Sequence, residues 1–171
     1  MPDASPAIAA EPSPATIAVV DIDGVVADVR HRLHHVRGPH SRWDRFFAAA
    51  AEDPPLATGI ALVADLARAH DVVWLSGRPE GLREVTAAWL ERQDLPPGRL
   101  YLRRARDYRP ARVMKLERIR DLARHAAVAA VIDDDPDVVD TLHAAGFPAV
   151  LADWVPHDKT LHRAQERDGR T

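Results

Sequence analysis

Two aspartates that follow a short apolar run are the residues best suited to chemistry in this sequence. Asp21 and Asp23 come at the end of the apolar run 17–20, and Gly24 follows them directly. Residues two apart on an extended chain point the same way, so both carboxylates can face one pocket. The glycine allows the chain to turn sharply there. Paired carboxylates in such a place indicate chemistry on an anion, with a divalent metal ion offsetting the crowded negative charge.

Three further groups of polar residues stand at the ends of other apolar runs or loops. They are Ser76-Gly77-Arg78, Lys115 and Asp133-Asp134. Each group by itself is also typical of a turn, a solvated side chain or the cap of a helix. Together, in this order, they predict a phosphate site. The acids would bind the metal, the Ser76 hydroxyl and the Gly77 N–H would meet phosphate oxygens, and Lys115 would supply a positive charge.

The segments between these groups alternate between strand and helix patterns. Short β-branched runs without polar alternation are typical of buried parallel strands, and apolar residues at helical spacing are typical of amphipathic helices. Strands are expected at 16–23, 71–79, 100–103, 128–132 and 148–152, and helices at 41–52, 58–70, 81–92, 111–125 and 137–145. This alternation predicts an α/β fold with a doubly wound parallel sheet. Ligands bind such sheets at the carboxyl ends of the strands.

The composition is that of an ordinary globular domain. The chain has 171 residues, of which 46% are hydrophobic and 29% charged, and its net charge of −3 gives no global drive toward nucleic acid or membrane. No apolar run approaches the roughly 18 residues of a membrane span. The sequence has no cysteine, which excludes disulfides and thiolate metal sites and is compatible with the cytoplasm, the expected location. We expect a disordered leader at 1–14, one domain at 15–156 and a polar tail at 157–171.

The ordered set of motifs resembles the haloacid dehalogenase-like phosphohydrolase superfamily. The four motifs of that superfamily are Asp-x-Asp-Gly after a strand, a Ser or Thr at a strand end, a Lys, and an acidic pair after a strand. They match Asp21-Ile22-Asp23-Gly24, Ser76, Lys115 and Asp133-Asp134. The resemblance covers about residues 16–154 and implies the α/β core of these enzymes, here with a minimal cap because the gaps between motifs leave no room for a large one.

The resemblance also implies a role for each matching residue. Asp21 would attack phosphorus and form an aspartyl-phosphate. Asp23 would protonate the leaving alcohol and then activate water, while its backbone carbonyl contacts the metal. Asp134 would be a direct Mg²⁺ ligand, and Asp133 would bind the metal through water or from outside its coordination shell.

A closer resemblance is to the 3′-phosphatase domain of bacterial and phage polynucleotide kinase–phosphatases. It is carried by the segments 76–78, 102–103, 106–110, 113–115 and 132–134. It implies that Arg78 and Arg103 help to hold phosphate. Asp135 stands where that family often has Arg, which bears on the substrate and not on the chemistry. The sequence contains no Gly-x-x-x-x-Gly-Lys-Ser/Thr loop, so no kinase half is expected.

A basic run beside the proposed site bears on the substrate. It consists of Arg103, Arg104, Arg106, Arg109 and Arg112. With the open site it favours a terminal phosphate on nucleic acid, more 3′ than 5′, with Arg106 and Arg109 at the backbone. A solvated surface loop and a free nucleotide as substrate remain alternatives.

Two other classes of protein share some of these residues. A receiver-type phosphoacceptor has an acidic cluster, a Ser or Thr and a Lys, but its acid pair precedes the phosphorylated Asp. A silent binding module on the same fold would not need the intact acids. His31, His34, His35 and His40 could form a zinc site, but no carboxylate completes it at clear spacing, so a solvated or substrate-facing basic segment is expected.

Overall fold

A five-stranded parallel sheet forms the centre of the molecule. The structure is a computed structural model that describes residues 15–169, so the leader expected at 1–14 lies outside the described residues. The strands are β1 (Thr16–Val20), β2 (Asp71–Pro79), β3 (Arg99–Arg103), β4 (Ala127–Asp133) and β5 (Ala149–Leu151). They lie in the order β3-β2-β1-β4-β5 and every neighbouring pair is parallel. This confirms the predicted α/β fold.

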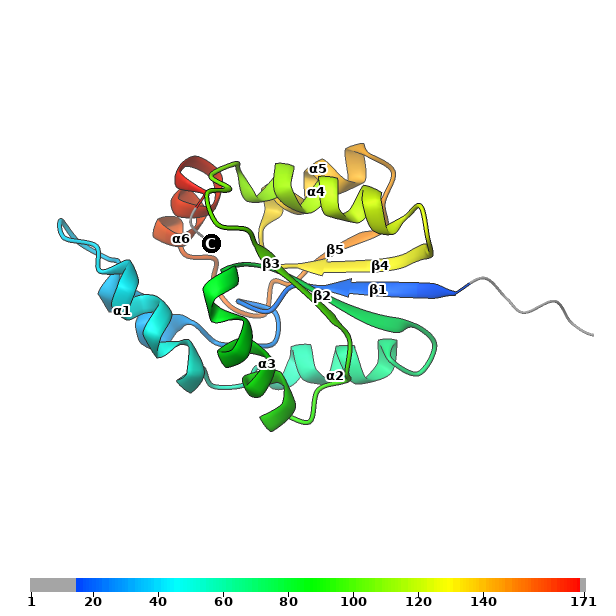
Figure 1. Cartoon of the computed structure of the whole chain (residues 1–171), viewed down its shortest axis with the longest axis horizontal. Coiled ribbons are helices and arrows are strands. Elements are labelled where there is room, and N and C mark those ends of the chain that lie inside the picture. Colours follow the sequence, from blue (N-terminus) through cyan, green and yellow to red (C-terminus); the bar gives the residue numbers. More distant parts are fainter. Residues whose placement is uncertain (1–14, 170–171) are drawn as a thin grey trace, which may run out of the picture.

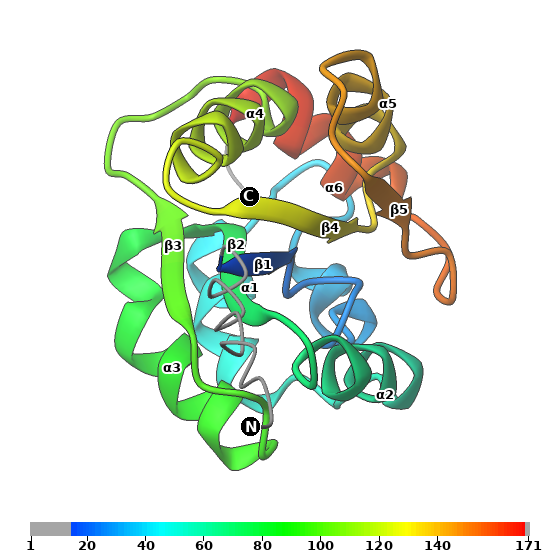
Figure 2. The same ribbon diagram turned by 90° about the vertical axis from the view of Figure 1, so that its right-hand side faces the viewer.

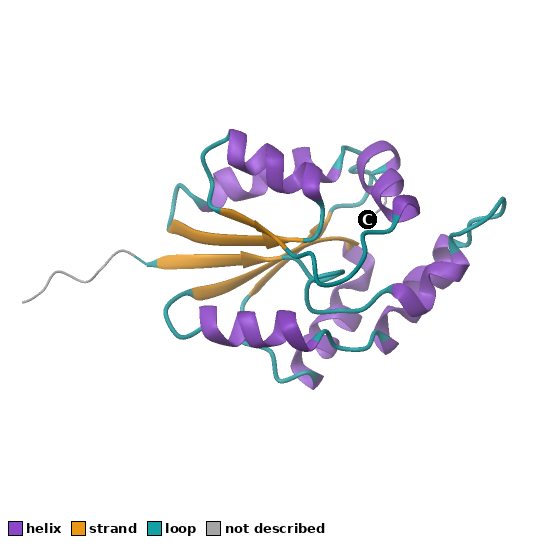
Figure 3. Ribbon diagram, turned by 180° about the vertical axis from the view of Figure 1, so that it is seen from behind, coloured by secondary structure: helices purple, strands orange, loops and turns teal. Residues whose placement is uncertain are grey.

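Helices cover both faces of the sheet (Figures 1 and 3). They are α2 (Ala57–Leu66) and α3 (Arg83–Arg92) on one face, and α4 (Ala111–Leu122) and α5 (Pro136–Ala144) on the other. Ile17 and Val19 pack with α4 and α5, whereas Val20 and Trp74 pack with α2 and α3. Because both faces are buried, β1 reads as an unbroken apolar run. Within residues 15–169, no helix has the length and apolar character needed to span a membrane.

A helical insertion, residues 28–56, separates β1 from α2. It contains a 3-10 helix (Arg30–His35), α1 (Trp43–Ala48) and a second 3-10 helix (Ala49–Glu52). The single helix expected at 41–52 is thus split into an α-helical and a 3-10 part. The insertion has a small apolar cluster of its own, built on Leu33 and Phe46. In Figure 1, α1 projects past the carboxyl ends of the strands, as a minimal cap would.

The segment after β5 returns to the same end of the sheet (Figure 1). It forms α6 (Lys159–Arg163), which continues into a π-helical turn (Ala164–Asp168). The side chain of Asp158 caps α6 by accepting hydrogen bonds from two of its backbone N–H groups. Leu161 packs into the apolar cluster of the insertion. Most of the segment expected to be a polar tail therefore lies against the domain.

Candidate active site

The residues singled out in the sequence converge at the carboxyl edge of the sheet. Asp21 and Asp23 follow β1, and Asp133 ends β4. Ser76-Gly77-Arg78 form the last part of β2, with all three residues buried. Lys115 reaches this edge from α4, where it contacts Asp21. Figure 2 shows how closely β1, β2 and β4 lie side by side, which explains why residues more than 90 positions apart meet here.

Lys115 lies between two aspartates. Its Nζ donates hydrogen bonds to Asp21 Oδ2 and Asp133 Oδ2, each at 2.6 Å, and all three side chains are at most 3% exposed. Burial opposes the charge on Lys115, but Asp133 and Asp21 outweigh burial and raise the pKa of the lysine. Burial raises the pKa of both Asp21 and Asp133 to about 6 despite the lysine between them. One ammonium therefore does not compensate the acids around it.

Asp134 adds a third carboxylate to this group. Oxygen atoms of Asp21, Asp133 and Asp134 lie within 4.8 Å of one another, and Asp134 Oδ1 is buried without a hydrogen-bond partner among residues 15–169. When all three carboxylates are ionised and His157, which lies 3.6 Å from Asp134, is neutral, the single ammonium leaves two negative charges uncompensated, which is the charge of one divalent cation. Because Mg²⁺ prefers oxygen ligands, the residues present fit the metal expected from the sequence.

Gly24 leaves space for the carboxylate of Asp134 beside the other acids. A Cβ at position 24 would lie 2.1 Å from Asp134 Oδ2, and the φ of +74° is one that side chains rarely adopt. The glycine of the Asp-x-Asp-Gly motif thus serves two purposes: it turns the chain after β1, and it makes room for the carboxylate that follows β4.

Asp23 belongs to a second cluster, the arginine–aspartate quartet formed by Asp23, Arg32, Asp53 and Arg78. Arg78 donates to Asp23 Oδ1 from Nε at 2.9 Å and from Nη2 at 2.5 Å, and Arg32 Nη2 adds a third bond at 3.1 Å. Arg32 also donates hydrogen bonds to both carboxylate oxygens of Asp53, at 2.7 and 2.8 Å, and Arg78 Nη2 donates to Asp53 Oδ2 at 2.7 Å. Two buried cations here face two carboxylates, so the quartet is balanced without a metal.

The quartet shifts the pKa values of its two aspartates in opposite directions. Burial would raise the pKa of Asp23, but Arg78 and Arg32 outweigh burial and hold that pKa below its usual range. Burial and the neighbouring Asp23 raise the pKa of Asp53. Arg78, expected to hold phosphate, is therefore occupied by carboxylates. The backbone N–H of Arg78 donates to Ser76 Oγ at 3.3 Å, so the serine hydroxyl lies next to Arg78 at the end of β2.

The arginines of the basic run 103–112 differ in their burial and in their partners. Arg103 is 4% exposed and donates to the carbonyl oxygens of Asp107 and Arg109, so it holds the loop after β3 together. Arg109 pairs with Asp107 and Glu117. Arg104 and Arg106 are exposed, and neither forms an ion pair with another described residue.

A groove of about 330 Å³ runs beside this loop at the carboxyl ends of β2 and β3. Its lining includes Phe47 and Tyr108, together with Arg103, Arg104 and Arg106. Tyr108 is 70% exposed, so its ring is accessible from solvent at the edge of the groove. The volume is that of a small-ligand site.

Sequence reasoning missed several residues of the site. Arg32 and Asp53 complete the quartet, and His31 Nε2 lies 2.8 Å from Asp53 Oδ1. Asp53 reads as a helix terminator because Pro54 and Pro55 follow it. In the sequence, Asp53 is a single acid within the insertion and belongs to no recognisable motif. No group of described residues able to hold a metal includes the histidines of the segment 31–40.

The sheet order and the strand-end residues together define a phosphatase of the haloacid dehalogenase-like type. A model of the polynucleotide kinase PNKP phosphatase domain matches residues 15–152, and the chain belongs to this family. No curated protein matches the sequence. Both the enzyme class and the likeness to kinase–phosphatases expected from the motifs are thereby confirmed.

Solved structures share the fold at low sequence identity. A chain of the Pnkp1/Rnl/Hen1 RNA repair complex has a TM-score of 0.68 and 22% identity, over 82% of this chain and 43% of the other. This protein therefore spans less than half of that neighbour. The class C acid phosphatase from Bacillus anthracis with tungstate bound has a TM-score of 0.62 and 17% identity, over 81% and 66%. A haloacid dehalogenase-like hydrolase from Streptococcus pneumoniae has a TM-score of 0.56 and 12% identity, over 90% and 92%.

Proposed function

We propose that this enzyme removes terminal phosphates from nucleic acid, preferring the 3′ over the 5′ end, with Mg²⁺ and through an aspartyl-phosphate on Asp21. The observation that carries the proposal is the group of Asp21, Asp133 and Asp134 around Lys115, with its uncompensated negative charge. Asp21, Asp134 and the backbone carbonyl of Asp23 would hold Mg²⁺, with Asp133 nearby. The metal would neutralise charge on the phosphoryl group.

In the first chemical step, a carboxylate oxygen of Asp21 forms a bond to phosphorus as the ester P–O bond breaks. Asp23 gives its proton to the leaving oxygen. In the second step, water attacks phosphorus, transfers a proton to Asp23 and releases Asp21 and inorganic phosphate. Lys115 holds Asp21 in place throughout and, with the Ser76 hydroxyl and the Gly77 N–H, offers hydrogen bonds to phosphate oxygens.

The surroundings of the site support a nucleic-acid end as substrate. Arg104 and Arg106 are exposed and can meet backbone phosphates, whereas Arg109 would first have to leave Asp107 and Glu117. The helical insertion is short, with three helical segments of four to six residues each, which supports an open site able to take a large substrate. A nucleotidase acting on free nucleotides is the second candidate, because the groove with Phe47 and Tyr108 is the size of a single nucleotide site. The match to a phosphatase family speaks against a receiver-type phosphoacceptor.

A panel of phosphomonoesters tests the proposal. It includes 3′- and 5′-phosphorylated DNA and RNA oligonucleotides, mononucleotides and sugar phosphates, each with Mg²⁺ and after chelation. RNA is included because a fold neighbour comes from an RNA repair complex. Protein carrying Asp21→Asn, purified in parallel, controls for contaminating phosphatases. We expect the highest kcat/KM on 3′-phosphorylated oligonucleotides. Better cleavage of mononucleotides at every salt concentration would replace this proposal by the nucleotidase.

A further inference from the structure

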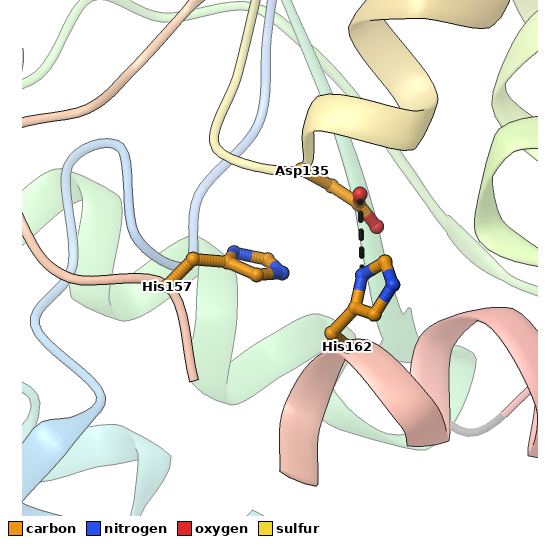
Figure 4. A group of neighbouring side chains, drawn as sticks. All are labelled: Asp135, His157 and His162. Atoms are coloured by element: carbon orange, nitrogen blue, oxygen red, sulfur yellow. Dashed lines mark ion pairs between the residues drawn. The ribbon is translucent and has the colours of Figure 1, made fainter. Parts of the chain in front are cut away.

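A second cluster of possible metal ligands lies outside the group around Lys115. It consists of Asp135 at the start of α5, His157 just before α6 and His162 within α6 (Figure 4). One ligand atom from each of the three lies within 4.8 Å of the other two. The reaction proposed above uses none of these side chains.

Four polar atoms of this cluster are buried and lack hydrogen-bond partners within the described part of the chain. Asp135 is 0% exposed, and its Oδ2 has no partner there, although its Oδ1 caps α5 by accepting from the N–H of Asp137. Both ring nitrogens of His157 and Nδ1 of His162 are likewise buried without a hydrogen-bond partner among the described residues. Leaving buried polar atoms unsatisfied costs free energy, on the order of 1–3 kcal/mol each. A cation among them would satisfy all three side chains together.

The geometry also orients the histidines. His162 Nε2 lies 3.4 Å from Asp137 Oδ2, which leaves Nδ1, 3.5 Å from Asp135 Oδ1, to face the centre of the cluster. A carboxylate on the outer nitrogen is a common way of fixing a metal-binding imidazole. His157 Nδ1 is 3.6 Å from Asp134 Oδ2, so His157 stands between this cluster and the acidic group.

We propose that Asp135, His157 and His162 bind a transition-metal ion of the zinc type, at a site separate from that of Mg²⁺. Two imidazoles and one carboxylate suit Zn²⁺, which accepts nitrogen ligands, whereas the all-carboxylate group at Asp21 suits Mg²⁺. Three protein ligands leave a fourth position for water. The ion joins the start of α5 to α6, and so holds the C-terminal segment beside the active site.

Metal binding to the full chain tests this proposal without any measurement of phosphatase activity. Titration with Zn²⁺ or Co²⁺ is followed by calorimetry and by the visible absorption of Co²⁺, in excess Mg²⁺ to occupy the acidic group. We expect one ion per chain and a Co²⁺ spectrum typical of four-coordinate nitrogen and oxygen ligands. His162→Gln and His157→Gln should each weaken binding at least about tenfold, or about 1.4 kcal/mol.

Two control variants locate the ion. His125→Gln alters an exposed histidine outside the cluster and should leave the affinity unchanged. Asp21→Asn alters the acidic group at a residue with no ion pair to either histidine of the cluster, and it should retain the tight Zn²⁺ site. Binding that survives His162→Gln but is lost in Asp21→Asn would put the ion in the acidic group and overturn the proposal. So would wild-type binding no tighter than that of His162→Gln.

A measurement on the wild-type protein covers variants that fail to fold. Diethyl pyrocarbonate modifies accessible histidines, and mass spectrometry locates the modified residues. We expect Zn²⁺ to protect His162, whose side chain is 34% exposed, while His125 reacts equally with and without the ion. Unchanged modification of His162 at saturating Zn²⁺ would refute the site.

Discussion

Arg78 donates two hydrogen bonds to a single oxygen of Asp23, at 2.9 and 2.5 Å. The pair ties the residue expected to hold phosphate to the residue expected to transfer the proton. While Arg78 stays bound to it, Asp23 is held in its ionised form, with its pKa below the usual range. A phosphate that draws Arg78 away would allow the pKa of Asp23 to rise, because burial then acts with less opposition. Substrate binding would in this way prepare the acid for the first step.

Asp53→Asn should destabilise the fold. The carboxylate of Asp53 is fully buried and accepts from both arginines of the quartet, so its loss leaves buried cations without compensation. We expect a loss of about 3 kcal/mol in the free energy of unfolding, measured with urea. Asp44→Asn is the control, because Asp44 and its partner Arg42 are exposed. That change should stay within about 0.5 kcal/mol. Equal effects of the two variants would contradict a structural role for the quartet.

Asp21→Asn should abolish turnover and leave the fold intact. The amide cannot act as the nucleophile, so kcat should fall at least about a thousandfold. Circular dichroism and thermal unfolding would check the fold. Residual activity within about tenfold of wild type would rule out Asp21 as the nucleophile.

Asp23→Asn should slow the enzyme to a degree that depends on the leaving group. An aryl phosphate leaves without much protonation, whereas an alkyl ester depends on the proton from Asp23. The ratio of kcat for aryl to alkyl substrates should therefore rise in the variant. An equal loss for both substrates would remove the proton-transfer role.

Mg²⁺ should stabilise the protein more at neutral than at acidic pH. The pKa values of Asp21 and Asp133, raised to about 6 by burial, exceed those of the unfolded chain. The metal-free protein therefore loses stability as pH rises from about 4 to about 6, because the folded state must give up protons that it binds more tightly than the unfolded state. Mg²⁺ should bind the ionised carboxylates and thereby restore this stability.

Thermal unfolding with Mg²⁺ and with chelator measures this effect. At a Mg²⁺ concentration about a hundred times its Kd, the gain should reach about 2.7 kcal/mol near pH 7.5 and be smaller near pH 5. Taking the difference at each pH cancels contributions from groups that do not contact the metal. An equal gain at both pH values would contradict Mg²⁺ binding to these carboxylates.

Salt dependence should reveal binding of the nucleic-acid backbone. Arg104→Gln combined with Arg106→Gln removes the two exposed arginines of the basic run that form no ion pair with another described residue. The slope of log(kcat/KM) against log[salt] on a single-stranded oligonucleotide should flatten by about 0.7 for each phosphate that the variant no longer neutralises. Cleavage of a mononucleotide should change little. Arg68→Gln, an exposed change beside the amino ends of β1 and β2, is the control. An unchanged slope in the double variant would exclude a role of these two arginines at the backbone.

The sequence was sufficient to predict the sheet because each strand-end residue follows an apolar run with an unmistakable pattern. Asp21 and Asp133 could be placed together since the carboxyl ends of neighbouring parallel strands meet at one edge. The direct contact of Lys115 with both carboxylates was not predicted, because the motif assigned its positive charge only to phosphate. The catalytic and metal-binding roles of these residues stay predictions.

Two of the four members of the arginine–aspartate quartet could not be predicted from the sequence. Arg32 and Asp53 lie in the insertion, where the chain has no long period to show which side chains face inward. The interaction of Arg78 with Asp53 spans 25 residues, and its geometry depends on how the insertion folds over β2. The cluster of His157 and His162 could not be predicted from the sequence for a related reason. Their segment is polar, and its attachment to the domain rests on few apolar residues, chiefly Leu161 and Ala164.

The place of Leu161 in the apolar cluster of the insertion also decides how the protein can be divided. A fragment trimmed to residues 15–152, the part that matches the phosphatase family, would keep every strand-end acid but lose α6. It would leave Leu33 and Phe46 with one wall of their cluster open to water. We therefore expect the folding boundary to lie beyond the family boundary in this chain, so that an expression fragment needs α6 to fold.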